Sequence, residues 1–154
     1  MPSVVLTTNK YHKFERVYNL IHNFVLKNAC RKGAYSLNCD HAAEEIRLYR
    51  NAMGPHTGRM VLYFRVIFSP EESRNLSMDD AEAIAQDICE FYCDEYQIVY
   101  GVHFYDNRWC VHFVINPINF HTGNSLAMTK AQKSQLLETI VIHSGFKNIH
   151  LYEE

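Results

Sequence analysis

The stretch from residue 98 to residue 116 constrains the fold of this chain more than any other part of the sequence. It reads as two strands joined at Asp106-Asn107, and a two-residue turn of Asn, Asp or Gly is the commonest connection of a β-hairpin. This turn also sets which residues lie opposite one another. The predicted pairs are Tyr105 with Arg108, His103 with Cys110, and Gly101 with His112.

The two faces of this hairpin differ in chemistry, because successive side chains along a strand point to opposite faces. The apolar face carries Val102, Phe104, Trp109, Val111, Phe113 and Ile115. The other face carries His103, Tyr105, Arg108, Cys110, His112 and Asn116. Two imidazoles and a thiol within a short distance are the donor types of a metal site. The alternative is that these histidines are hydrogen-bonded residues on a half-buried face and that the cysteine packs there.

The remaining sequence predicts further strands and helices around the hairpin. Strands are expected at residues 3–8, 60–68 and 148–152, and helices at 10–27, 40–53, 77–92 and from Thr129 to a terminating Gly145. With a hairpin at the centre and helices between the other strands, this order favours the α+β class. We expect one domain over residues 1–154, a two-layer arrangement of helices packed on a mostly antiparallel sheet, with a central β-hairpin at about residues 96–116.

The composition fits a globular protein of the cytoplasm. Hydrophobic residues make up 47% of the 154 residues and charged residues 21%. No apolar run approaches the roughly 20 residues of a membrane helix, and the first residues lack the pattern of a signal peptide. No membrane partner is therefore expected. Five cysteines without a framework spacing indicate reduced thiols.

Charge is distributed unevenly along the chain. A net charge of −2 argues against attraction of nucleic acid to the whole surface. Residues 10–32, however, hold six basic side chains against Glu15, whereas residues 71–95 hold nine acidic ones against Arg74. The basic segment could contact phosphates, or it could be a solvated helix face.

Four segments in the same order resemble the relaxases, the mobilisation nucleases of conjugative and mobilisable plasmids in the HUH endonuclease superfamily. They are residues 36–45, which contain Asn-Cys before a helix, 68–70 (Phe-Ser-Pro), 96–99 (Tyr-Gln-Ile-Val) and 112–123 (His-Phe-Val-Ile-Asn-Pro-Ile-Asn-Phe-His-Thr-Gly). The resemblance implies nicking of one DNA strand. A tyrosine of the first helix attacks a phosphodiester, and three histidines hold a divalent cation that stabilises the developing charge.

The resemblance places a divalent metal ion (Zn, Mn or Mg) at His103, Cys110 and His112. The two histidines match the family's ligands, whereas Cys110 stands at the third ligand position, Tyr105 at that of an aspartate and Arg108 at that of an additional histidine. A thiolate prefers zinc to the magnesium or manganese suited to phosphoryl transfer. Arg108 would repel a cation, yet a guanidinium can grip a phosphate directly, so phosphate contact without metal is the alternative.

The nucleophile position also departs from the family pattern. In the segment that resembles the first relaxase motif, residues 14–23, the tyrosine position is Leu20. Tyr18 lies two residues earlier, about 200° around a helix, and falls in the predicted apolar stripe of Phe14, Val17, Tyr18, Ile21 and Val25. This spacing favours Tyr18 as a core residue over Tyr18 as the catalytic nucleophile. Tyr11 is a second candidate nucleophile.

Three functions follow from these patterns. The first is a relaxase-like domain of a mobile element that has lost or impaired strand nicking and binds single-stranded or hairpin DNA. Its predicted DNA-binding residues are Lys10, Lys13, Arg16, Tyr105, Arg108 and Asn116, beside the two histidines. The second is an active, metal-dependent nickase that uses Tyr18 or Tyr11. The third is a protein-interaction module that presents its acidic helix, with Asp79, Asp80, Glu82, Asp87 and Glu90, to a basic partner.

Overall fold

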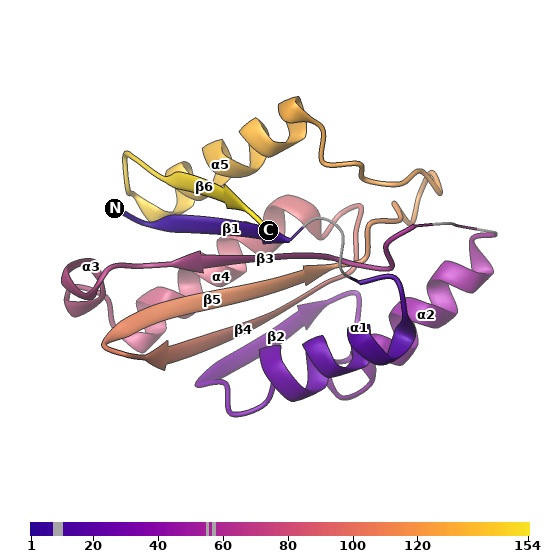
Figure 1. Ribbon diagram of the computed structural model, residues 1–154, viewed down its shortest axis with the longest axis horizontal. Coiled ribbons are helices and arrows are strands. Elements are labelled where there is room, and N and C mark those ends of the chain that lie inside the picture. Colours follow the sequence, from indigo (N-terminus) through magenta and orange to yellow (C-terminus); the bar gives the residue numbers. More distant parts are fainter. Residues whose placement is uncertain (8–10, 55, 57) are drawn as a thin grey trace.

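The computed structural model describes residues 1–7, 11–54, 56 and 58–154. Its centre is a six-stranded sheet in the order β2-β4-β5-β3-β1-β6 (Figure 1). The strands are β1 (Ser3–Thr7), β2 (Arg31–Tyr35), β3 (Leu62–Ile67), β4 (Ile98–Tyr105), β5 (Arg108–Ile115) and β6 (His150–Glu153). Within the described residues β6 runs parallel to β1, and the other neighbouring pairs are antiparallel. The prediction of a mostly antiparallel α+β fold is therefore confirmed.

Helical segments connect these strands. They are α1 (Phe14–Leu20), the π-helix η1 (Ile21–Val25), the 3₁₀-helix η2 (Cys39–His41), α2 (Ala42–Ala52), α3 (Pro70–Arg74), α4 (Met78–Tyr92) and α5 (Lys130–Ser144). The sequence patterns did not predict β2 or the short α3. The predicted helix at residues 10–27 is shorter in the structure and changes from α to π geometry at residue 21.

The central hairpin has the predicted register. Asp106 and Asn107 have φ values of 53° and 59°, so both turn residues adopt the left-handed conformation of a type I′ turn. The pairs are Tyr105 with Arg108, His103 with Cys110, and Gly101 with His112. The turn twists with the strands, and it thereby fixes which side chains share a face.

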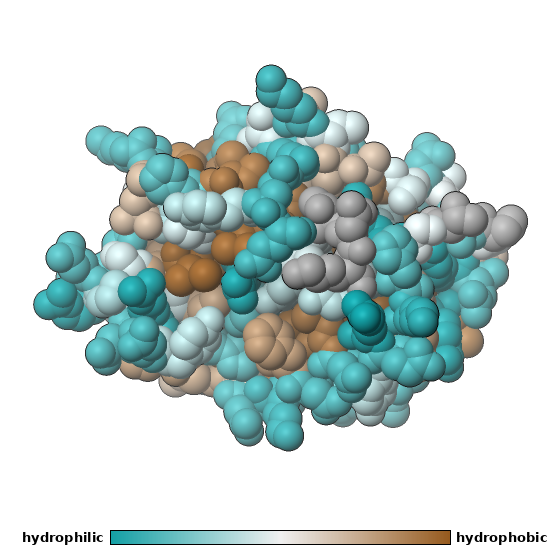
Figure 2. Space-filling view, in the orientation of Figure 1, coloured by the Kyte–Doolittle hydropathy of each residue, from teal (hydrophilic) through white to brown (hydrophobic). Residues whose placement is uncertain are grey.

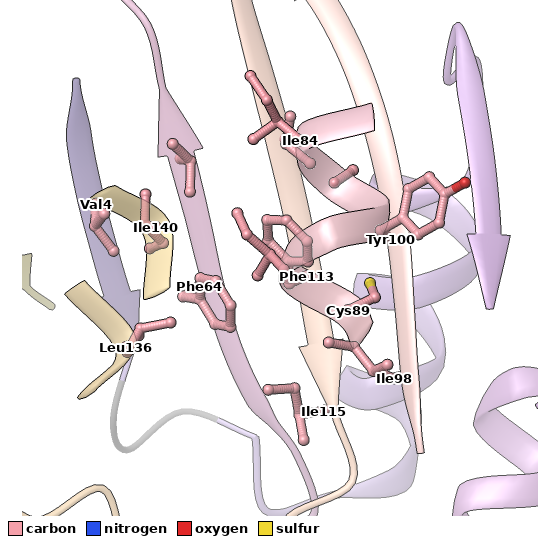
Figure 3. Close-up of a cluster of buried hydrophobic side chains, with 14 of the residues drawn as sticks. Val4, Phe64, Ile84, Cys89, Ile98, Tyr100, Phe113, Ile115, Leu136 and Ile140 are labelled. Carbon is pink, nitrogen blue, oxygen red and sulfur yellow. The ribbon is translucent and has the colours of Figure 1, made fainter. Parts of the chain in front are cut away.

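The larger hydrophobic core lies between one face of the sheet and helices α4 and α5. Phe64 of β3 and Phe113 of β5 stack there with ring centroids 4.7 Å apart. Figure 3 shows side chains of α4 and α5 lying against these strands, among them Ile84 and Ile140. Both helices begin with the predicted capping boxes, Ser77 with Asp80 and Thr129 with Gln132.

A second, smaller core lies on the opposite face, where α1, η1 and α2 pack over part of the sheet. Its strand residues alternate with those of the larger core: Tyr63 and Val114 belong to it, whereas Phe64 and Phe113 do not. Helices therefore cover both faces, and this adds a partial third layer to the expected two. Figure 2 shows apolar side chains in separate patches on this face, with polar side chains between them.

The buried stripe of the first helix differs from its predicted composition. Val17, Leu20, Ile21 and Val25 are buried, whereas the Tyr18 side chain is 38% exposed. The prediction that Tyr18 belongs to the core is thus wrong. Residues 17, 20 and 21 face the sheet together at helical spacing, and this rotation points residue 18 toward α2. There Tyr18 packs on His22, with ring centroids 4.6 Å apart, and His22 contacts Glu44.

Gly101 allows η1 to approach the sheet closely. A Cβ atom built on Gly101 would lie 2.0 Å from the carbonyl oxygen of Val25. The same carbonyl oxygen contacts Nε2 of His103 at 2.7 Å. The absence of a side chain at residue 101 therefore brings the π-helix to the polar residues of the hairpin.

We predict that Gly101→Ala destabilises the protein by about 1–3 kcal/mol or more, because the backbone of η1 must move away from β4. Thermal unfolding followed by circular dichroism should show a lower Tm. Gly33→Ala is the comparison and should lower the Tm less. Its Cβ would meet the side-chain ring of Tyr100, which can move, instead of a backbone carbonyl. An unchanged Tm in Gly101→Ala would show that the close approach is not required.

Candidate functional site

The structure places His103, Cys110 and His112 on one face of the sheet, opposite the larger core. His103 lies directly across from Cys110, and His112 is two residues further along β5 on the same face. The rings of the two histidines are perpendicular, with centroids 5.0 Å apart. The sulfur of Cys110 is 3.5 Å from Nε2 of His112. The predicted grouping of two imidazoles and a thiol is therefore present.

His112 is the buried centre of this group. Its side chain has 2% exposure, and its Nδ1 shares a hydrogen bond of 2.6 Å with the Tyr63 hydroxyl of β3. Burial, followed by the electrostatic influence of His103 and then of Arg65, lowers the pKa of His112 to about 3. His112 is therefore a neutral imidazole near pH 7, and both its ring nitrogens contact protein atoms.

Cys110 is a fully buried thiol. Burial raises its pKa, although a hydrogen bond from the Tyr105 hydroxyl and the charge of Arg65 act in the opposite direction. Burial, together with this hydrogen bond, raises the pKa of Tyr105 to about 12. Cys110 is thus a protonated packing residue in this state and not a thiolate ready for a metal ion.

The π-helix η1 contacts both histidines on this face of the sheet. Its Val25 carbonyl contacts Nε2 of His103 at 2.7 Å, and its Phe24 ring lies edge-on to His112 with centroids 5.1 Å apart. A π-turn widens the helix by one residue, and such turns occur often at functional sites. Here it places a carbonyl group and an aromatic ring over the site within successive residues.

The donors of this group do not fit a metal ion. His103 and His112 direct ring nitrogens to Val25, Tyr63 and Cys110, and the thiol is protonated. Across the described ranges 1–7, 11–54, 56 and 58–154, no group of three or more His, Cys, Asp or Glu residues is arranged to hold a metal ion. A metal ion at the predicted ligands would require one ring nitrogen of His112 to exchange its protein contact for the metal.

The other predicted DNA-binding residues lie in different surroundings. Tyr105 and Arg108 are exposed at the end of the hairpin, and Lys13 and Arg16 are exposed at the start of α1. Asn116 is completely buried and donates a hydrogen bond of 2.9 Å to the side chain of Gln97, so its side chain stabilises the loop after β5. Lys10 lies outside the described residues.

Leu20, which the resemblance placed at the family's tyrosine position, packs in the smaller core at 6% exposure. It lines an open pocket of about 380 Å³. The lining consists of Tyr11, Arg16, Asn19, Leu20 and Phe24. Tyr11 therefore shares the pocket with Leu20, whereas Tyr18 packs on the α2 side of the helix. The structure thus brings a tyrosine near the nucleophile position from the segment before α1.

Two site residues were not found from the sequence, Tyr63 and Arg65 of β3. Arg65 lies opposite His112 in the sheet, so it shares a face with the histidines. Tyr63 packs against Tyr11, with ring centroids 6.0 Å apart and perpendicular planes. The signal that could have found them is a charged residue within the apolar run at 60–68, two positions from a tyrosine on the same face.

Comparison with known protein families assigns the class. The model of the family described as "Relaxase: MobA/VirD2-like, nuclease domain" matches residues 10–141. This match covers most of the chain, including α1, the hairpin and most of α5. The chain therefore belongs to the relaxase family and has a relaxase-like nuclease domain. No curated protein matches the chain.

Family membership gives the context of the site. Relaxase nuclease domains generally use a divalent metal ion, and the family implies binding of DNA. Against this, the donors described above are engaged with protein atoms. Among the described residues, none of the helices has the length and apolar character needed to cross a membrane.

We predict that His112 makes stability depend on pH. The unfolded side chain takes up a proton near pH 6.5, whereas the folded one resists it until about pH 3. Stability therefore falls as the pH drops below 6.5, by at most about 1.4 kcal/mol per pH unit from this group. His112→Gln should flatten the dependence of the unfolding free energy on pH between 6.5 and 5, measured by urea denaturation.

The exposed His41 provides the control for this measurement. His41→Gln should keep the pH slope of the wild type. Slopes are compared, because His112→Gln also removes the contacts with Tyr63 and Cys110 and lowers stability at every pH. An equal slope in His112→Gln and the wild type would contradict a neutral buried imidazole.

Proposed function

We propose that this protein is a relaxase-type domain of a mobile element that binds single-stranded or hairpin DNA and has lost strand nicking, or nearly so. The observation that carries the proposal is Leu20. The resemblance puts it at the family's nucleophile position, and its alkyl side chain is buried and lines the pocket with Tyr11 and Arg16. An alkyl group cannot attack a phosphodiester, so a covalent step has no nucleophile at this position.

The charge of α1 supports DNA binding. Lys13 and Arg16 are exposed at the beginning of the helix, and Arg16 lines the same pocket as Leu20. Phosphate contacts by such side chains supply most of the affinity of non-specific DNA binding. Tyr105, half exposed at the hairpin end, offers a ring on which a base can stack.

The acidic helix supports the protein-interaction reading less well. Its Asp79 and Glu82 are paired with Arg31 of β2, at 3.0 Å and 3.7 Å. Tyr100 donates a hydrogen bond to Glu82 as well. Part of the acidic charge of α4 is therefore balanced within the chain and is less available to a basic partner.

One observation favours a second candidate function, an active nickase that uses Tyr11. Tyr11 lines the pocket with Leu20 and contacts Tyr63, which is bonded to His112. Burial, followed by the charge of Glu154, raises the pKa of Tyr11, and this opposes activation of its hydroxyl. The first function is therefore preferred.

We predict that the protein binds single-stranded oligonucleotides with strong salt dependence. Arg16→Gln and Lys13→Gln should each weaken binding and reduce the slope of log K against log [salt] by about one where a phosphate contact is lost. Fluorescence anisotropy with a labelled oligonucleotide measures both quantities. Lys130→Gln on α5, across the sheet, removes the same charge and should have little effect. Salt-independent binding, or equal losses in all variants, would refute the proposal.

We also predict that the protein forms no covalent adduct with single-stranded or hairpin DNA in the presence of Mg²⁺, Mn²⁺ or Zn²⁺. Denaturing gel electrophoresis detects such an adduct as a shifted band. A band that disappears in Tyr11→Phe and persists in Tyr18→Phe would establish the nickase instead. Failure to bind DNA at all would leave the protein-interaction module.

A further inference from the structure

Arg65 is a charged residue within the sheet, next to the site. It lies in the middle of β3, opposite His112, and its side chain emerges on the face that carries His103 and Cys110. Its Nη2 lies 3.6 Å from the carboxylate of Glu154, with side-chain exposures of 26% and 48%. Arg65 is therefore partly buried and loosely paired at the edge of the site.

The guanidinium of Arg65 retains hydrogen-bonding capacity. Its Nε is buried without a hydrogen-bond partner, although the side chain also hydrogen-bonds the Tyr63 hydroxyl. Arg50 of α2 shows the contrast, because its guanidinium donates three hydrogen bonds to carbonyl groups of the segment before β3. A buried N–H group without an acceptor is unfavourable, so an acceptor that reaches Arg65 would be bound favourably.

The surroundings of Arg65 suit an anion. The charge of Arg65 lowers the pKa of several neighbouring groups, although burial has the largest influence on each of them. These groups are Tyr11, Tyr63, Tyr105, Cys110 and His112. They are neutral near pH 7, so they do not offset its charge. Arg16 acts on Tyr11 from the other side of the pocket.

We propose that Arg65 is the phosphate-binding group of this site and that the Glu154 carboxylate occupies it until a phosphate displaces that carboxylate. A planar guanidinium fits two oxygens of a phosphodiester as it fits those of a carboxylate. Arg65 thus supplies a fixed positive charge on the face where the donors do not fit a metal ion. This inference rests on the proposed DNA-binding function and names the group that contacts the backbone of the strand.

The position of Glu154 makes the exchange feasible. Its backbone N–H donates to Leu6 of β1 at 2.9 Å, which holds the residue at the edge of the sheet. Its carboxylate reaches Arg65 only at 3.6 Å, longer than a good charge-assisted hydrogen bond. An ion pair that is half exposed and of this length is weak, so a phosphate with better geometry can replace it.

The first test titrates the protein with inorganic phosphate and follows the arginine Nε–H signals by NMR. The Arg65 signal, assigned by its loss in Arg65→Gln, should shift in a saturable way. Glu154→Gln should tighten phosphate binding about threefold, since the competing charge is gone. The second test measures binding of a labelled single-stranded oligonucleotide. Arg65→Gln should weaken it about tenfold, whereas Lys130→Gln should not.

The outcomes separate this inference from the proposed function. If the oligonucleotide binds and Arg65→Gln leaves both its affinity and the phosphate titration unchanged, DNA binding stands and the role of Arg65 is refuted. If the oligonucleotide does not bind but phosphate shifts the Arg65 signal, the anion site stands and the DNA-binding function fails. If Arg65→Gln does not fold, phosphate affinity is measured in Arg65→Lys and Glu154→Gln instead. A phosphate affinity equal to that of the wild type in both variants refutes the inference.

Discussion

The turn at Asp106 and Asn107 is the constraint on which the rest of the site depends. Both residues have positive φ values, and the resulting type I′ turn fixes the register of β4 against β5. A slip of one residue would move every side chain of one strand to the other face. Trp109 and Phe113 would leave the larger core, and the pairing of His103 with Cys110 would be lost. The energy of the core therefore holds the polar group in place.

The polar side chains of this face form a hydrogen-bonded chain, and they do not form a set of free metal ligands. The hydrogen-bonded chain runs from Tyr63 through His112 to Cys110 and on to Tyr105, and each member is neutral near pH 7. A metal ion needs free lone pairs that converge on one point, and here the lone pairs are directed at neighbouring side chains. A cysteine at residue 110 fits this arrangement, because a thiol packs well in a buried position. The relaxase family fold is thus combined with donors that contact one another.

The sequence predicts the parts of the structure that depend on local rules. The hairpin register follows from Asp106-Asn107, and the starts of α4 and α5 follow from their capping boxes. The position of Tyr18 could not be predicted in this way, because Tyr18 and Leu20 are both apolar enough to belong to the stripe. Only packing against the sheet selects Leu20. Arg65 was missed for a related reason: its neighbours His112 and Glu154 are distant in sequence, and strand pairing alone brings them together.

Leu20, Cys110 and Arg65 have linked consequences for the proposed function. Leu20 carries no nucleophilic group, the Cys110 thiol is protonated, and Arg65 places a guanidinium on the face that carries Cys110. A catalytic metal and a nearby guanidinium would repel each other, so Arg65 is tolerated best where no metal ion is needed. A fixed guanidinium can still bind a phosphate in the ground state, which requires no activated oxygen. The combination therefore supports the proposal that this domain binds a DNA strand without cleaving it.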